Sequence, residues 1–248
     1  RAYMEMGLSC WANKDSALAL EHLNKAYELQ AEGNSKGDLA AITGNIGNVY
    51  IGMQDYKTAY KYFQKCLDIF KELNSEEGIG KTYISIGITL WGIDKLDDAL
   101  EYVNKCLTIF ERLDNKEVIA ESYSVLGSIY TDKGEFETAQ IYFDKALDIS
   151  KEYNLQYKLE NLYESKYQCA EKMGDYKTAF NFSKKHHEAV SRRLKEAAEV
   201  KTNYLNAMHD MDLLRNESEN LSEKNTALSE LNQQLNSKNN TLSDTLNT

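Results

Sequence analysis

Apolar and small residues recur along this chain at two different steps. Through the first 190 or so positions the step is 40 residues, and it is clearest for the alanines Ala19, Ala59, Ala99, Ala139 and Ala179. A lysine keeps the same step from Lys25 to Lys185, and a glycine keeps it from Gly7 to Gly127. A fixed period in this range is typical of stacked structural repeats. The sequence therefore predicts about five repeats in one register.

Within one repeat the spacing predicts a pair of helices. In the fourth unit Leu126 and Tyr130 are four residues apart, which places them on one face of a helix. Gly127 lacks a side chain where a neighbouring helix must come close. Phe143 supplies bulk from a second helix, and Gly134 lies in the turn between the two helices. We expect an all-α protein built from antiparallel helix pairs, without β-sheet.

These residues form a recognisable motif. The fourth unit reads Tyr123-x-x-Leu126-Gly127-x-x-Tyr130, followed by Ala139-x-x-x-Phe143. This pattern resembles the tetratricopeptide-repeat (TPR) signature, with tyrosine in place of its usual tryptophan. The first and fifth units match less well, and in the fifth Tyr167 replaces the glycine while His186 replaces a small residue. The period of 40 exceeds the usual 34 and the closing proline is absent, which longer helices would explain. The resemblance implies a TPR helix-pair solenoid over residues 1–190.

The resemblance also implies where a partner binds. In TPR proteins the first helix of each pair lines a concave surface that holds a protein or peptide. Transferring those positions to this chain gives a set that is mostly apolar: Met4, Leu8, Trp11, Asn48, Ile51, Ile84, Ile88 and Trp91. The fourth unit supplies polar groups instead, among them Glu121, Ser124 and Ser128. Asn48 resembles the asparagines that hold a ligand's main chain in peptide-binding TPR proteins.

Two interpretations of this apolar set remain open. Trp11 and Trp91 are the only tryptophans of the chain and occupy the same repeat position. Tryptophan is enriched at binding hot spots, and exposed apolar patches usually mark an interaction site. The residues would therefore line a ligand groove. Alternatively, they pack against a further helix outside this sequence or against a neighbouring chain.

After about residue 190 the step changes to seven. Leucine recurs at Leu214, Leu221, Leu228, Leu235 and Leu242, with asparagine at the alternate seam positions Asn225, Asn232 and Asn239. A heptad of this kind predicts a coiled coil over residues 191–248, and paired asparagines favour a parallel homodimer. Three successive asparagines make the seam weak. The alternative is a single solvated or partly disordered tail.

The order of the two segments resembles the sensory half of bacterial signalling proteins. In those proteins TPR units feed a coiled coil that ends in a histidine kinase or diguanylate cyclase domain. The resemblance implies a regulatory sensor whose output domain lies beyond Thr248. A passive scaffold that assembles complexes is the second hypothesis, and an enzyme of unfamiliar type is the third. Because Arg1 falls inside a repeat, we expect the chain to be part of a longer protein, which leaves a preceding signal or membrane segment open.

Composition narrows the class further. The 248 residues include no proline, which fits a chain that is helical almost throughout. The charge balance of 29 basic against 39 acidic residues argues against nucleic-acid binding. No apolar stretch is long enough to span a bilayer, so we expect no membrane contact from this segment. The four cysteines form no CxxC pair, and Cys66 and Cys106 occupy positions held by alanine in other units. We expect small packing residues in a cytoplasmic protein.

Catalytic chemistry is not expected. The sequence contains no glycine-rich phosphate loop, HExxH or GxSxG motif. The one cluster worth considering is His186, His187 and Glu188, with His209, Asp210 and Asp212 further along. Adjacent histidines point about 100° apart on a helix and cannot easily share a metal ion. We therefore expect no catalytic residue, no metal and no cofactor.

Overall fold

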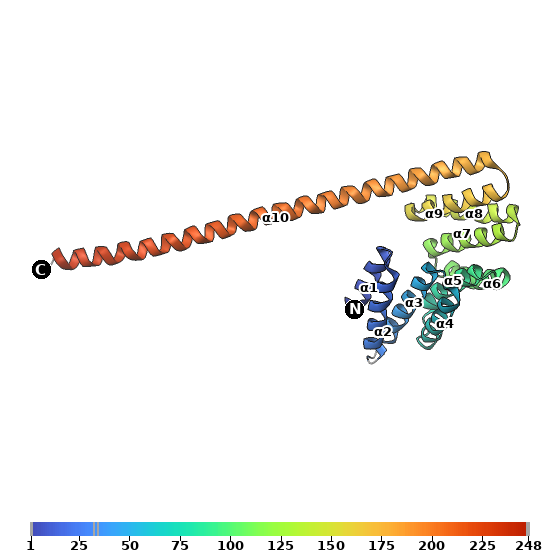
Figure 1. Ribbon diagram of the computed structural model, residues 1–248, viewed down its shortest axis with the longest axis horizontal. Helices are drawn as coiled ribbons and strands as arrows, with labels where there is room; N and C mark the ends of the chain where they lie inside the picture. Colours follow the sequence, from blue (N-terminus) through green and yellow to red (C-terminus); the bar gives the residue numbers. More distant parts are fainter. Residues whose placement is uncertain (1, 32, 34, 247–248) are drawn as a thin grey trace. The chain divides into compact units, whose positions relative to one another are not determined.

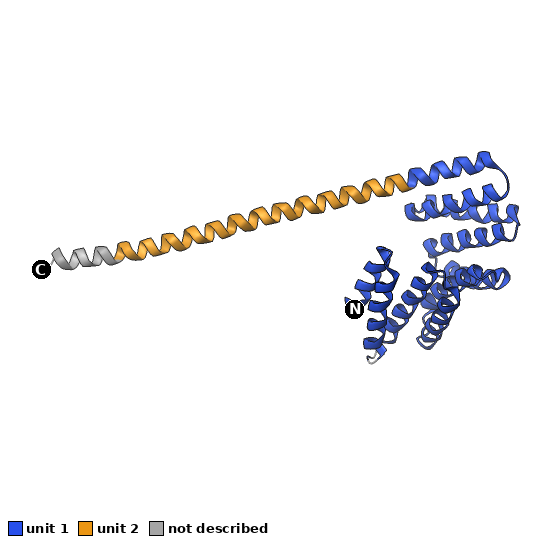
Figure 2. Cartoon of the chain, viewed as in Figure 1, with its two compact units in different colours: residues 1–189 blue, residues 190–248 orange. Residues whose placement is uncertain are grey.

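The computed structural model describes residues 2–31, 33 and 35–246, with side chains as far as Asn236. Within these ranges the chain forms ten helices and no strand (Figure 1): α1 Ala2–Ala12, α2 Ser16–Ala31, α3 Lys36–Gly52, α4 Tyr56–Glu72, α5 Glu76–Gly92, α6 Leu96–Arg112, α7 Lys116–Asp132, α8 Phe136–Glu152, α9 Gln156–Lys172 and α10 Tyr176–Leu246. The chain divides into two compact units, residues 1–189 and 190–248 (Figure 2). The expected all-α repeat solenoid with a long terminal helix is confirmed.

The length of the helices explains the unusual period. Each helix from α3 to α9 spans 17 residues. A connection of three residues, such as Met53–Asp55, joins each of these helices to the next. Two such helices with their connections give the 40-residue step. The longer helices inferred from the sequence therefore account for the departure from 34.

Each three-residue connection ends one helix and begins the next. After α3, the Gln54 N–H donates to the Ile51 carbonyl at 2.8 Å and the Asp55 N–H donates to the Tyr50 carbonyl at 2.9 Å. This is the Schellman arrangement, in which the middle residue is left-handed. The Asp55 carboxylate then accepts from the Thr58 N–H at 3.1 Å and caps α4. The hydrogen bonds from Thr58 hold the pKa of Asp55 below its usual value.

The left-handed position recurs every 20 residues. It is occupied by Lys14, Gln54, Asn74, Asp94, Asp114, Gly134, Asn154 and Gly174. Only glycine adopts this conformation without a steric cost. Backbone hydrogen bonds alone thus close every turn, which explains how the solenoid does without proline.

Replacing Gly134 with alanine should lower the free energy of unfolding by about 1 kcal/mol, because a Cβ is strained at positive φ. Gly134 has a φ of +77° and open space around it, so backbone strain is the sole expected cause. Gly37 is the matched control, since it lies in α3 with equally open surroundings. Gly37→Ala should stabilise by roughly 0.5 kcal/mol through helix propensity. Urea unfolding of both variants measures this, and a loss of stability in both would contradict it.

The close approach of the two helices at Gly127 is confirmed. A Cβ added to Gly127 would lie 2.6 Å from the ring of Phe143, which is too close for any real contact. The same glycine position meets Leu23, Phe63 and Val103 in the first three repeats. The glycine therefore lets the second helix of each pair insert a large side chain against the first.

The fifth repeat has a more polar interior than the others. Lys166 is 8 % exposed and stands where the preceding repeats bury an isoleucine or leucine. Its ammonium is 2.7 Å from the Asp144 carboxylate and 5.0 Å from the centre of the Phe182 ring. Tyr167, which replaces the glycine, donates its hydroxyl to Glu171. The last helix pair therefore rests less on apolar burial than the four before it.

The lysine that recurs every 40 residues has a structural role. Lys105 lies with its ammonium 4.8 Å from the centre of the Tyr102 ring. Lys65, Lys145 and Lys185 lie over an aromatic ring of their own repeats in the same way. Such contacts contribute about 0.5–1 kcal/mol each at exposed sites.

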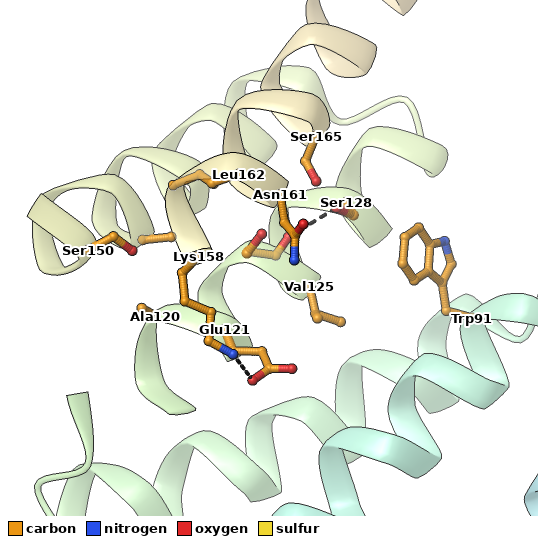
Figure 3. A pocket seen from close by; sticks show the side chains of 12 residues that line it. Trp91, Ala120, Glu121, Val125, Ser128, Ser150, Lys158, Asn161, Leu162 and Ser165 are labelled. Atoms are coloured by element: carbon orange, nitrogen blue, oxygen red, sulfur yellow. Dashed lines mark hydrogen bonds and ion pairs between the residues drawn. The ribbon is translucent and has the colours of Figure 1, made fainter. Parts of the chain in front are cut away.

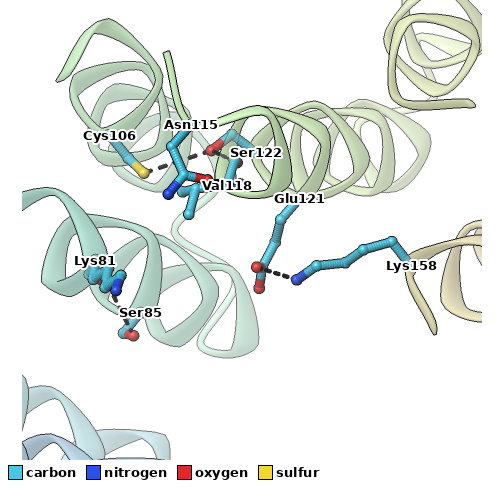
Figure 4. A network of polar contacts seen from close by, with 8 residues as sticks. All are labelled: Lys81, Ser85, Cys106, Asn115, Val118, Glu121, Ser122 and Lys158. Atoms are coloured by element: carbon cyan, nitrogen blue, oxygen red, sulfur yellow. Dashed lines mark hydrogen bonds and ion pairs between the residues drawn. The ribbon is translucent and has the colours of Figure 1, made fainter. Parts of the chain in front are cut away.

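The cysteines are packing residues, as expected. Cys66 and Cys106 are buried, and all four cysteines are free thiols. The sulfur of Cys106 is 3.5 Å from the Ser122 hydroxyl (Figure 4). Burial raises the pKa of the Cys106 thiol to about 11, so it stays protonated and unreactive.

The odd-numbered helices lie on the inner side of the solenoid. Contacts join α1 to α3, α3 to α5, α5 to α7 and α7 to α9. The even-numbered helices from α2 to α8, all within the described ranges, make no such contact with one another. Helices that converge on one side and diverge on the other produce a curved unit. The odd helices therefore form the concave face of residues 1–189, where the sequence places the candidate site.

Candidate functional site

The predicted groove residues lie on α1, α3 and α5. Five of them are half-buried: Met4, Leu8, Asn48, Ile51 and Ile88. Trp91 is also half-buried, and Trp11 is 36 % exposed. Ile84 differs, since it is 6 % exposed and belongs to the core shared by the second to fourth repeats. Ile84 therefore stabilises the fold and leaves the surface to its neighbours.

The two tryptophans connect adjacent repeats. The Trp91 Nε1–H donates to the Asp132 carboxylate at 2.6 Å, at the end of α7. Asp132 also pairs with Lys172 at the end of α9. Trp11 lies in the same way against the end of α3, where a Cβ added to Gly52 would be 3.4 Å from its Nε1. Each indole braces the next repeat while part of its ring stays accessible.

Beside Trp91 lies a pocket of about 190 Å³, formed by α5, α7, α8 and α9 (Figure 3). Buried side chains form an apolar base: Ala120, Ala146 and Leu162. The indole of Trp91 closes one side. A pocket with apolar walls and a few convergent polar groups is the usual form of a ligand site.

The upper part of the pocket is polar. Its hydrogen-bonding groups are Ser124, Ser128, Asn161 and Ser165. Glu121 and Lys158 form an ion pair across it at 2.5 Å (Figures 3 and 4), and the Lys158 side chain is 16 % exposed. Glu121, Ser124 and Ser128 are the polar groups that the sequence places on this face. Lys158, Asn161 and Ser165 were missed, because the fifth repeat matches the TPR motif poorly.

One polar group at the base stands apart. Ser150 is 1 % exposed and lines the pocket, and its Oγ has no hydrogen-bond partner among the described residues. A buried hydroxyl without a partner costs about 1–3 kcal/mol. The motif did not reveal Ser150, because it comes from the second helix of its pair. A comparison of equivalent repeat positions would have found it, since Phe70 and Phe110 occupy the same place.

The seam residues of the predicted coiled coil lie on α10 and point to solvent in the single chain. Leu214, Leu221, Leu228 and Leu235 are all more than half exposed. Asn225 and Asn232 are exposed as well. Asn239 and Leu242 lie outside the residues whose side chains are described.

The histidine cluster shows no arrangement for chemistry. The Nδ1 of His186 is 3.1 Å from the Glu160 carbonyl oxygen, which orients the ring toward the backbone of α9. Within the described ranges, no three His, Cys, Asp or Glu side chains gather in a way that could hold a metal ion. In the same part of the chain, no helix is both long and apolar enough to cross a membrane.

Comparison with known families agrees with this architecture. Residues 1–72, 38–112 and 78–152 each match the Tetratricopeptide repeat family, and together these matches cover more than half of the chain. The protein belongs to the tetratricopeptide-repeat family. No curated protein matches it.

Solved structures share the fold at low sequence identity. A Rap protein complexed with Competence and Sporulation Factor is 20 % identical, with a TM-score of 0.70 over 76 % of this chain and 53 % of that one. The Rap conjugation gene regulator of the plasmid pLS20, in complex with a Phr peptide, is 22 % identical, with a TM-score of 0.60 over 77 % and 55 %. A STAND signal-transduction ATPase with a TPR sensor, from Pyrococcus horikoshii, is 18 % identical, with a TM-score of 0.63 over 80 % and 31 %. This chain thus spans about half of the first of these proteins, and the likeness concerns the fold.

Proposed function

We propose that this chain is a protein- or peptide-binding regulatory module whose concave face receives an extended peptide. The observation that carries the proposal is the pocket, because its walls come from three successive repeats of the inner face. Trp11, Ile51 and Ile88 add partly accessible apolar area along the same face. The Rap structures with a bound factor or peptide support the idea that this fold can hold such a ligand.

The chemistry of the face suits a peptide main chain with apolar side chains. The Asn48 amide makes no hydrogen bond within the described residues and is half-buried on α3. A carboxamide can donate to a peptide carbonyl and accept from a peptide N–H at once. The Ile51 and Ile88 side chains pack on the core, so little side-chain entropy is lost when a ligand covers them.

The groove is tested with peptides selected from a random library against the full chain. Ile88→Ala should weaken their binding about tenfold or more, since removing a partly buried anchor typically costs 1–2 kcal/mol. Ile141→Ala is the matched control, because Ile141 is 57 % exposed on the even-numbered helix α8. Fluorescence anisotropy gives both dissociation constants. Equal losses in the two variants, or a library that yields no binder, would count against the groove.

The finer part of the proposal concerns output. A parallel coiled coil through α10 would join two copies and couple the solenoid to an output domain of kinase or cyclase type beyond Thr248. Because linkage is reciprocal, a ligand that alters the seam must bind with different affinity to monomer and dimer. A passive scaffold, the alternative function, would bind its partner equally in both states. Peptide titrations at low and high protein concentration separate the two.

A further inference from the structure

The pocket arises from one departure in the repeat pattern. Phe70 and Phe110 occupy equivalent positions in the second and third repeats, and Phe110 is fully buried. Glycines make room for both rings: a Cβ added to Gly78 would lie 2.3 Å from Phe70, and one added to Gly80 would lie 2.6 Å from Phe110. In the fourth repeat the same position is Ser150.

The neighbours of the missing ring are the walls of the pocket. Gly80 precedes Phe110 by 30 residues, and Gly78 follows Phe70 by eight. The same offsets from Ser150 lead to Ala120 and Lys158, and both line the pocket. The pocket therefore occupies the volume that a phenylalanine ring fills in the preceding repeats, and it opens to the concave face instead.

We infer that this pocket is the anchor site for a tyrosine side chain of the bound peptide, an inference that rests on the proposed function. A phenol ring matches the size and shape of the vacated volume. Its hydroxyl can exchange a hydrogen bond with the Ser150 Oγ, which has no partner among the described residues. The Trp91 indole offers an aromatic wall, and ring pairs gain free energy beyond their buried area.

The electrostatics select against other occupants. Glu121 lies at the mouth, so a ligand carboxylate would meet a like charge. Lys158 already pairs with Glu121, so a ligand cation would have to displace it. A phenylalanine side chain would fill the volume but leave the Ser150 hydroxyl buried without a partner, which is costly.

The test uses p-cresol and toluene, which reproduce the tyrosine and phenylalanine side chains. In an NMR titration of the full chain, p-cresol should bind at least about fivefold more tightly than toluene, because one buried hydrogen bond separates them. Ser150→Ala keeps the volume and should remove this preference. Ser150→Leu fills the volume and should abolish binding of both. A wild-type chain that binds neither probe, or that prefers toluene, overturns the inference.

A second arm separates the pocket from the groove. Selected peptides that contain tyrosine should lose about tenfold or more in affinity with Ser150→Leu, because their anchor is excluded. If peptides bind but tolerate this change, the groove stands and the anchor site is overturned. If p-cresol is preferred but no peptide is ever selected, a peptide is not the occupant, and the proposed function fails instead. Should Ser150→Leu not fold, the pair Ala120→Gly with Ser150→Phe recreates the packing of Gly80 and Phe110.

Discussion

Replacing Phe143 with alanine should lower the free energy of unfolding by about 3–5 kcal/mol, the usual cost of truncating a fully buried aromatic ring. Phe143 is 1 % exposed and packs against Gly127, whose missing side chain makes room for it. It also belongs to the core cluster that connects the fourth and fifth repeats. The cavity left behind would sit between helices that cannot close without shifting the whole repeat.

A matched control is available on the next repeat. Phe180 lies on α10 and is 71 % exposed, so Phe180→Ala should change stability by less than about 0.5 kcal/mol. Because neighbouring repeats stabilise one another in sequence, hydrogen exchange should show the loss first in α7 to α9. Chemical denaturation with hydrogen-exchange readout measures both effects. A loss for Phe143→Ala below that of the control would mean that the fourth repeat is not packed as described.

The repeat architecture could be predicted because its determinants are local and recur. Gly127 and Phe143 are 16 residues apart in one unit, and every inner unit except the last repeats this pairing of a glycine with a bulky side chain. Each copy strengthens the inference from the others. The helix ends were also implicit, since the left-handed residues follow a step of 20, although only Gly134 and Gly174 reveal it by residue type.

The candidate site was harder to predict because it depends on contacts between repeats. Ile84 shares a repeat position with Ser124 and was expected on the surface, yet the core closes over its side chain. Asp132 gave no signal as the partner of Trp91, because the two are 41 residues apart and belong to different units. Ser150 differs visibly from Phe110, but only the structure shows that the ring at that position fills the space between helices.

Replacing Leu221 and Leu228 together with alanine should weaken self-association of the full chain by about 100-fold or more, since each buried leucine contributes roughly 2 kcal/mol or more. Both residues occupy the leucine position of the heptad, and both are more than half exposed in the single chain. Large apolar side chains in a regular stripe require a partner, and a second copy of α10 supplies one in register. Asn225 and Asn232 then pair with their own copies, which a parallel arrangement alone allows.

The control for this pair is a second pair of leucines with the same exposure on the outer face of α10. Leu205 and Leu213 are 56 % and 54 % exposed but lie outside the seam positions. Their replacement by alanine should leave the dissociation constant unchanged within about threefold, because no seam contact is lost. Sedimentation over a concentration series, with residues 1–189 as the monomeric reference, gives the constants. Dimers of residues 1–189 as tight as those of the full chain, or equal losses for the two leucine pairs, would place the interface elsewhere than the heptad seam.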